Sequence, residues 1–184
     1  MKTKRHILLL IIVFMLFGCK KEKEEVTNIE QPIQPFFTFG EVGNEWTYEH
    51  INVHGVQQDT TISMVKYVIT EKNNNNLYTY KTDISQDDFQ WYISSDAFGI
   101  SENKIYVKKD SKVGDSYHPS CLILAVDEIL YILNDSLSCF KVNTLVGLEP
   151  SSKILWINNK YGIVKIESSN EYDKDVYTLM NTNF

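Results

Sequence analysis

The residue types that could do chemistry in this 184-residue chain are few and scattered. His50 and His54 are the only close histidine pair. On one β-strand they would share a face but lie about 13 Å apart at 3.3 Å per residue, too far to bind one ion. Acidic residues gather at Asp87-Asp88 and over 170–175, where Ca²⁺ is an alternative to a surface turn, but the spacing lacks the glycine and bidentate glutamate of an EF-hand. We predict no metal centre and no cofactor.

Enzyme signatures are also missing from the sequence. The serines lie in polar turns without a Gly-x-Ser-x-Gly elbow, and the eight glycines form no phosphate or dinucleotide loop. A glycosidase-like carboxylate pair stays open, because the fold alone sets the separation of such a pair. We therefore predict a protein that is not an enzyme and has no catalytic residue, with a hydrolase built from loops as an alternative.

Aromatic residues are abundant, with 11 Tyr, 9 Phe and 3 Trp. Alternating aromatics on strands mostly form the core, since each large ring buries roughly 150–250 Å². Trp91-Tyr92 is the pair to single out, because adjacent strand residues face opposite sides of a sheet. One of the two then faces solvent or a partner, so we predict Trp91 and Tyr92 as binding residues.

The first 18 residues have the pattern of an export signal. A basic start is followed by an apolar run from Ile7 to Phe17 and by Gly18-Cys19. The run is shorter than the roughly 20 residues of a transmembrane helix. Leu16-Phe17-Gly18-Cys19 resembles the lipobox of bacterial lipoproteins, although Phe17 is larger than the usual residue there. The resemblance implies cleavage before Cys19 and acylation of Cys19, which would attach the mature protein to membrane lipid.

Residues 19–35 read as a charged, proline-punctuated tether, and residues 36–184 as a single β domain. Removing the leader takes away three of the 18 Lys and Arg and none of the 24 Asp and Glu, so the mature chain has a net charge of −9. This charge argues against a nucleic-acid partner. Glutamates after Cys19 resemble the surface-export signal of Bacteroidota lipoproteins, or simply keep the tether soluble. We expect a lipid-anchored protein of the bacterial cell envelope, at the outer membrane, on an undecided face.

Short runs rich in β-branched and aromatic residues, separated by turn residues, dominate the body. They predict about ten strands in an all-β fold with little helix: a curved antiparallel sheet, a partly closed barrel or a sandwich. Short helices are conceivable only within residues 95–101 and 121–130. The expected strands are residues 46–53, 60–70, 77–84, 89–93, 104–108, 122–133, 137–146, 154–157, 163–167 and 176–180.

Two cysteines follow Cys19, namely Cys121 and Cys139. A hairpin turning at Asn134-Asp135 would place Cys139 opposite about residue 130, leaving Cys121 about 30 Å further along the strand at 3.3 Å per residue. A disulfide requires Cα atoms within roughly 7 Å. We predict that both thiols are free and buried.

An internal echo links Glu41-Val-Gly-Asn-Glu-Trp46 to Lys112-Val-Gly-Asp-Ser-Tyr117, and both are expected to start equivalent hairpins. With Ser-Cys-Phe-Lys-Val and the closing Tyr-Gly-Ile-Val-Lys-Ile, these segments resemble a group of small uncharacterised lipoproteins common in Bacteroidota. The resemblance spans Phe39 to Ile166, and Asn134-Asp-Ser-Leu replaces a Pro-Ala-Gly-Thr-like turn of that group. It implies a curved antiparallel sheet, and it brings neither an activity nor a catalytic residue.

Three hypotheses for function follow. The first is a non-enzymatic module that binds a protein or glycan partner through its sheet face. The second is a carrier or sensor of a lipid or other apolar ligand, and the third is a hydrolase. A cavity of at least about 300 Å³ lined by apolar residues would favour the carrier, an exposed Trp-Tyr strip the binding module, and buried convergent carboxylates or histidines the hydrolase.

Overall fold

A computed structural model describes residues 34–55, 59–145 and 151–184, apart from the side chains of Gln86 and Asp87. The predicted signal, Cys19 and most of the predicted tether lie outside these residues. Gln34–Phe184 form one compact unit. Within its described residues the regular structure is all strand: β1 Glu45–His54, β2 Asp59–Lys72, β3 Leu77–Thr82, β4 Ser85–Ile93, β5 Ala97–Ser101, β6 Lys104–Lys108, β7 Leu122–Ile132, β8 Asp135–Asn143, β9 Ser152–Asn158, β10 Gly162–Ser169 and β11 Asp173–Thr182.

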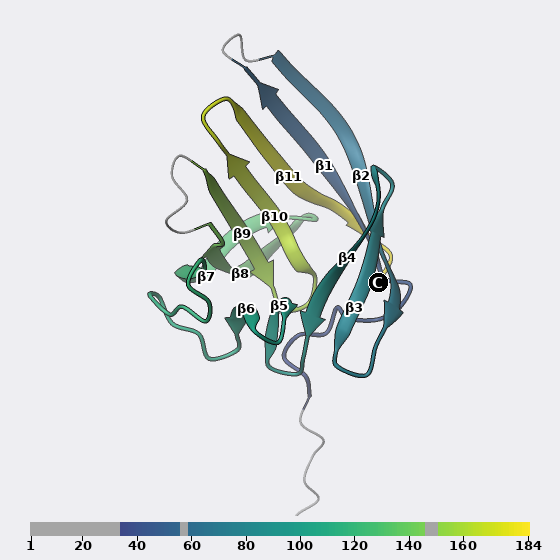
Figure 1. The fold of residues 1–184 in the computed structure, drawn as a ribbon, viewed down its shortest axis with the longest axis vertical. Coiled ribbons are helices and arrows are strands. Elements are labelled where there is room, and N and C mark those ends of the chain that lie inside the picture. Colours follow the sequence, from purple (N-terminus) through teal and green to yellow (C-terminus); the bar gives the residue numbers. More distant parts are fainter. Residues whose placement is uncertain (1–33, 56–58, 146–150) are drawn as a thin grey trace, which may run out of the picture. The chain divides into compact units, whose positions relative to one another are not determined.

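The eleven strands form one antiparallel sheet in the order β6-β5-β4-β3-β2-β1-β11-β10-β9-β8-β7. Strands that follow each other in sequence pair as hairpins, except β6 and β7, and the pairing of β1 with β11 joins the two halves. The sheet curls until β6 contacts β7 and β8, so that it nearly closes into a barrel (Figure 1). The predicted fold class is confirmed, as a partly closed barrel.

Aromatic side chains fill one end of the interior. The segment before β1 crosses this end, because the N–H of Phe36 donates to the Ser95 carbonyl at 2.7 Å and that of Thr38 to the Asn159 carbonyl at 3.0 Å. Phe39, fully buried, packs against Phe98 with ring centroids 5.2 Å apart. We call this aromatic cluster the plug; its members are Phe37, Phe39, Trp46, Trp91 and Phe98.

The two segments in which the sequence allowed short helices form strands instead. Residues 97–101 form β5, and residues 122–132 form β7. Gly99 explains the first, since a Cβ there would lie 2.3 Å from the Lys104 carbonyl oxygen and 2.7 Å from the Cα of Ile105. The close approach of β6 therefore requires glycine at this position.

The β7–β8 hairpin forms with a different register from the predicted one. Its two-residue turn is Leu133-Asn134, both at positive φ of 58° and 60°, one residue before the expected position. This earlier turn places Cys139 opposite Glu128 rather than about residue 130, and a positive φ at Asp127 accompanies a separate register shift between Ala125 and Glu128. Cys121 and Cys139 are nevertheless free and buried, as predicted.

The two Val-Gly-Asn/Asp segments share a turn but not a role. Gly43 and Gly114 have φ of 92° and 91°, a conformation that favours glycine. Only the first turn leads directly into a strand, where Trp46 is fully buried. The second is followed by irregular structure and the isolated bridge from His118 to Cys121, so the expectation of equivalent hairpins is wrong.

Candidate functional site

A cavity of about 420 Å³ lies inside the curled sheet. Its lining side chains come from β2–β6 and the β3–β4 turn on one side and from β9–β11 on the other, so it lies between the two halves of the sheet. One part of its wall is aromatic: Tyr67, Tyr80, Phe89, Trp91, Tyr106 and Tyr177. The rest is aliphatic, with a few polar residues: Ile84, Ile100, Leu155, Ile163, Ile166, Thr82, Ser85, Gln90 and Lys153.

The aromatic wall is continuous with the plug through Trp91. The Tyr80 ring lies 4.3 Å from Trp91, 5.4 Å from Phe89 and 5.7 Å from Tyr67, measured between centroids. Strand alternation produces this wall, because β3 and β4 pair Tyr80 with Phe89 and Tyr78 with Trp91 on the inner face. The rings therefore hold one another in place around the cavity.

Burial keeps the cavity tyrosines neutral. It raises the pKa of Tyr80 to about 12 and raises those of Tyr67 and Tyr106 further. Tyr177 shifts in the same direction, first through burial and then through the charge of Asp175. At neutral pH these residues offer a ligand apolar ring surface and phenolic hydroxyls without negative charge.

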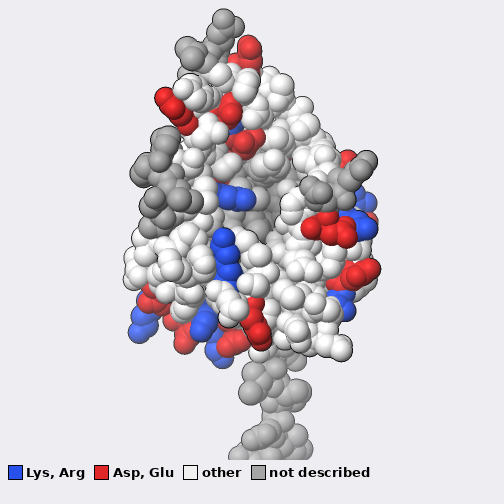
Figure 2. Space-filling view, viewed as in Figure 1, with Lys and Arg blue, Asp and Glu red and all other residues white. Residues whose placement is uncertain are grey.

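Lys153 is the one cation on the cavity wall, among the residues that the structure describes. It belongs to the inward-facing set of β9 together with Leu155 and Ile157, which are almost fully buried. Burial lowers its pKa, and the charge of Lys104 on β6 lowers it further. Figure 2 shows basic side chains near the middle of this face, and acidic side chains toward its ends.

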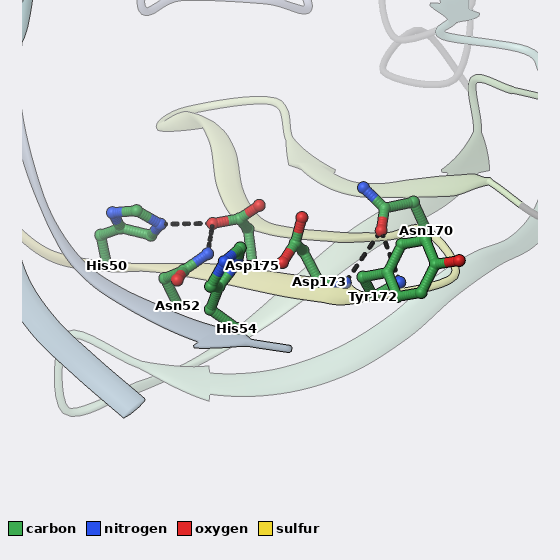
Figure 3. A network of polar contacts seen from close by, with 7 residues as sticks. All are labelled: His50, Asn52, His54, Asn170, Tyr172, Asp173 and Asp175. Atoms are coloured by element: carbon green, nitrogen blue, oxygen red, sulfur yellow. Dashed lines mark hydrogen bonds and ion pairs between the residues drawn. The ribbon is translucent and has the colours of Figure 1, made fainter. Parts of the chain in front are cut away.

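A polar network continues the inner face beyond the cavity, where β1 pairs with β11 (Figure 3). His50 stacks on the cavity residue Tyr177, with ring centroids 4.1 Å apart and planes 2° apart. Its Nε2 lies 2.8 Å from Asp175 Oδ1, which also accepts a hydrogen bond from the side-chain amide of Asn52 at 2.8 Å. The same pairing brings His54 Nδ1 into contact with Asp173 Oδ1.

The network resembles a Ser-His-Asp arrangement in composition only. Ser63 Oγ lies 3.5 Å from His50 Nδ1, at the outer limit of hydrogen bonding. Asp175 and Asp173 are the partners of His50 and His54. Among the residues with described side chains, no group of three or more His, Cys, Asp or Glu is arranged to hold a metal ion.

Of the two predicted binding residues, Trp91 is 4% exposed and lines the cavity, while Tyr92 is half-buried on the opposite face of β4. The Trp91 indole therefore faces the cavity, and only a ligand inside the cavity could contact it. The sequence pattern missed Lys153 altogether. The period-two alternation of Lys153, Leu155 and Ile157 is the signal that could have shown it facing inward.

A cluster of lysines around an aromatic ring lies on the outer face, at Trp156. The Nζ atoms of Lys141 and Lys165 lie 5.0 and 4.7 Å from the centroid of the indole, which is only 4% exposed. Trp156 Nε1 donates to Glu128 Oε1 at 2.8 Å, and Lys141 Nζ lies 3.4 Å from the same oxygen. Lys165 has its own partner in Glu167 at 2.6 Å. We call these residues the outer cluster.

Comparison with known proteins identifies a fold relative but no family. A crystal structure from Bacteroides fragilis, described as a candidate exported protein with a YmcC-like fold, matches with a TM-score of 0.50 and 12% identity, covering 82% of this chain and 100% of that one. No family model matches the sequence, and no curated protein matches it. The likeness shows the fold alone.

No helix within the described residues is long and apolar enough to cross a membrane.

Proposed function

We propose that this protein is a non-enzymatic envelope lipoprotein that holds an apolar ligand, such as an acyl chain, in the cavity of its β body, as a carrier or sensor. The observation that carries the proposal is the cavity of about 420 Å³ with its ring-lined wall. This volume falls within the roughly 300–1,000 Å³ of small-molecule sites, which are mostly apolar with a few placed polar groups. The burial of Trp91 supports this function over a sheet-face binding module, because no Trp-Tyr strip is exposed at Trp91-Tyr92.

Blocking the cavity tests the proposal. Ile166 lines the cavity from β10 and is only partly buried, so Ile166→Trp places a large ring in the space for a ligand. Ile62 lies on β2, is 67% exposed and does not line the cavity, so Ile62→Trp is the matched control.

The measurement is native mass spectrometry of the acylated mature protein, which begins at Cys19, purified in mild detergent from its own membranes. We expect a co-purifying small apolar molecule with the wild type and with Ile62→Trp, and none with Ile166→Trp. Bare wild-type protein, or equal loading of all three proteins, would contradict the proposal.

Lipid anchoring through Cys19 belongs to the same proposal. The apolar run, Gly18-Cys19 and the likeness to lipoproteins of Bacteroidota support it, and the fold relative described as exported is compatible with an envelope location. Two or more acyl chains make membrane attachment stable where one does not. Labelled palmitate should enter the wild type and not Cys19→Ala; labelling of both proteins would rule out Cys19 as the acylated residue.

One observation favours a second candidate function, the binding of a partner protein. Ile129 and Tyr131 lie two residues apart on β7 and are 62% and 74% exposed, so two large exposed side chains share one face of this strand at the edge of the sheet. If they form an interface, replacing both with Ser should abolish a specific cross-link formed in intact cells. An unchanged cross-linking pattern would leave the cavity as the functional site.

A further inference from the structure

Among the side chains that the structure describes, the cavity lining includes a lysine and no carboxylate, and this bears on the ligand. Lys153 lines the cavity, and Lys104 is the charged group that acts on it. Both are partly buried. Within the described part of the chain, neither has a carboxylate within 4.0 Å or a side-chain hydrogen bond, whereas four other lysines do have carboxylate partners, namely Lys66, Lys81, Lys141 and Lys165.

A partly buried lysine that has lost water without gaining a partner is costly, because the charged ammonium loses solvation. A lysine that served only packing could be replaced by an uncharged residue of similar length. An anion bound in the cavity would supply the missing partner, and the low polarity of the walls would strengthen that ion pair relative to water.

The rest of the cavity fits the body of such a ligand. The aliphatic side chains of Leu155 and Ile166 lie on the wall that also carries Lys153, and the tyrosine rings face them from β2 and β3. The cavity tyrosines stay neutral at physiological pH, so they do not repel an anion and can donate hydrogen bonds to it.

We propose that the cavity ligand is an anionic amphiphile, a monocarboxylate with an acyl body, whose carboxylate pairs with Lys153, with Lys104 adding to the local positive charge, while the acyl body lies along the ring-lined wall. This inference rests on the proposed function and specifies its ligand. A neutral lipid would fill the same volume but leave Lys153 unpaired. A cationic ligand would meet repulsion from both lysines.

The test compares three probes with the same chain and different heads: decanoate, decanol and decylamine. Binding is measured by isothermal titration calorimetry at neutral pH with the mature chain carrying Cys19→Ser, so that no acyl chain of its own competes. The variants are Lys153→Met, which keeps the length of the side chain without the charge, and Lys153→Arg, which keeps the charge. Lys174→Met, on an exposed position of β11, is the control.

We expect the wild type to bind decanoate at least about tenfold more tightly than decanol, the size of effect that a hydrogen bond to a charged group supplies, and decylamine most weakly. Lys153→Met should abolish the preference for decanoate while retaining decanol binding, and Lys153→Arg and Lys174→Met should keep that preference.

Equal affinities for decanoate and decanol in the wild type would overturn the proposal of an anionic ligand but leave the proposal of an apolar ligand in the cavity standing. If Lys153→Met still prefers decanoate to decanol, Lys153 is not the residue that pairs with the carboxylate. Failure to bind any of the three probes would overturn both proposals.

Discussion

Lysines lie on both faces of this sheet, beside Trp156 on the outer face and on the cavity wall inside, and the two places differ in one respect. In the outer cluster, Lys141 and Lys165 flank Trp156, and each also has a carboxylate partner. At the inner cavity, Lys153 shares the wall with several tyrosines, and neither it nor Lys104 has a carboxylate partner among the described residues. The outer arrangement is complete in itself and therefore structural. The inner one lacks a negative charge, which is why we assign it to a ligand.

The largest expected effect lies in the outer cluster. Trp156→Ala removes an indole that is 4% exposed and on which both lysines rest, so we expect a loss of about 3–5 kcal/mol in the free energy of unfolding. Urea denaturation followed by circular dichroism measures it. A loss below about 1 kcal/mol, the ordinary size for a surface change, would show that the outer cluster does not stabilise the sheet.

Glu128→Ala should have a smaller effect, about 1–3 kcal/mol, because it leaves the Nε1–H of Trp156 and the ammonium of Lys141 without their acceptor. Glu128→Gln is the control, since its amide oxygen can still accept from the indole. The hydrogen bond from Trp156, aided by Lys141 and Lys165, lowers the pKa of Glu128. Its contribution to stability is therefore present above the unfolded-state pKa and is lost as the pH falls through the lower folded-state value. Equal stability of the Ala and Gln variants would contradict this role.

At the inner cavity, the charge of Lys153 should instead be detected as a change in ligand affinity at high pH. The pKa of Lys153 lies below its ordinary value of 10.5 because of burial and Lys104. Affinity for decanoate should therefore be full below this lowered pKa and fall as the pH rises through it, while affinity for decanol stays constant. Tyr80, with a pKa of about 12, and Tyr67, shifted further, remain neutral in this range. Calorimetric titrations at successive pH values measure the effect, and parallel curves for the two probes would contradict it.

The smallest expected effect completes the contrast. Lys153→Met without ligand should change the free energy of unfolding by no more than about 0.5 kcal/mol, or raise it slightly, because a poorly solvated charge is replaced by an apolar side chain of similar length. The same urea denaturation measures it. A loss as large as that of Glu128→Ala would mean that Lys153 has a structural partner, and the distinction between the two faces would fail.

Much of the fold could be predicted from the sequence, because strands and their turns are local patterns. The all-β class follows from short alternating runs, and 104–108 was predicted with the bounds of β6. Register was harder to predict. The β7–β8 turn falls at Leu133-Asn134, although leucine rarely adopts a positive φ, and this difference of one residue from Asn134-Asp135 moves Cys139 opposite Glu128.

The candidate site was less accessible to sequence reasoning, since it is a tertiary feature. His50 and Asp175 were each noted, but they are 125 residues apart, and only the β1–β11 pairing brings them together. Trp91 was singled out on the grounds that one of two adjacent aromatics must face outward, and the structure gives that position to Tyr92. The cavity collects side chains from most strands of the sheet, and no spacing along the chain encodes it.

The β1–β11 pairing also has a consequence for the order of events during folding. All other strand pairs are hairpins between consecutive strands, which close short loops and form early. The β1–β11 ladder joins residues such as Trp46 and Thr182 and closes by far the longest loop. We therefore expect two half-sheets to form first and their docking to limit the folding rate. In a chain that crosses a membrane from its N-terminus, the ligand cavity can be completed only after β11 has emerged.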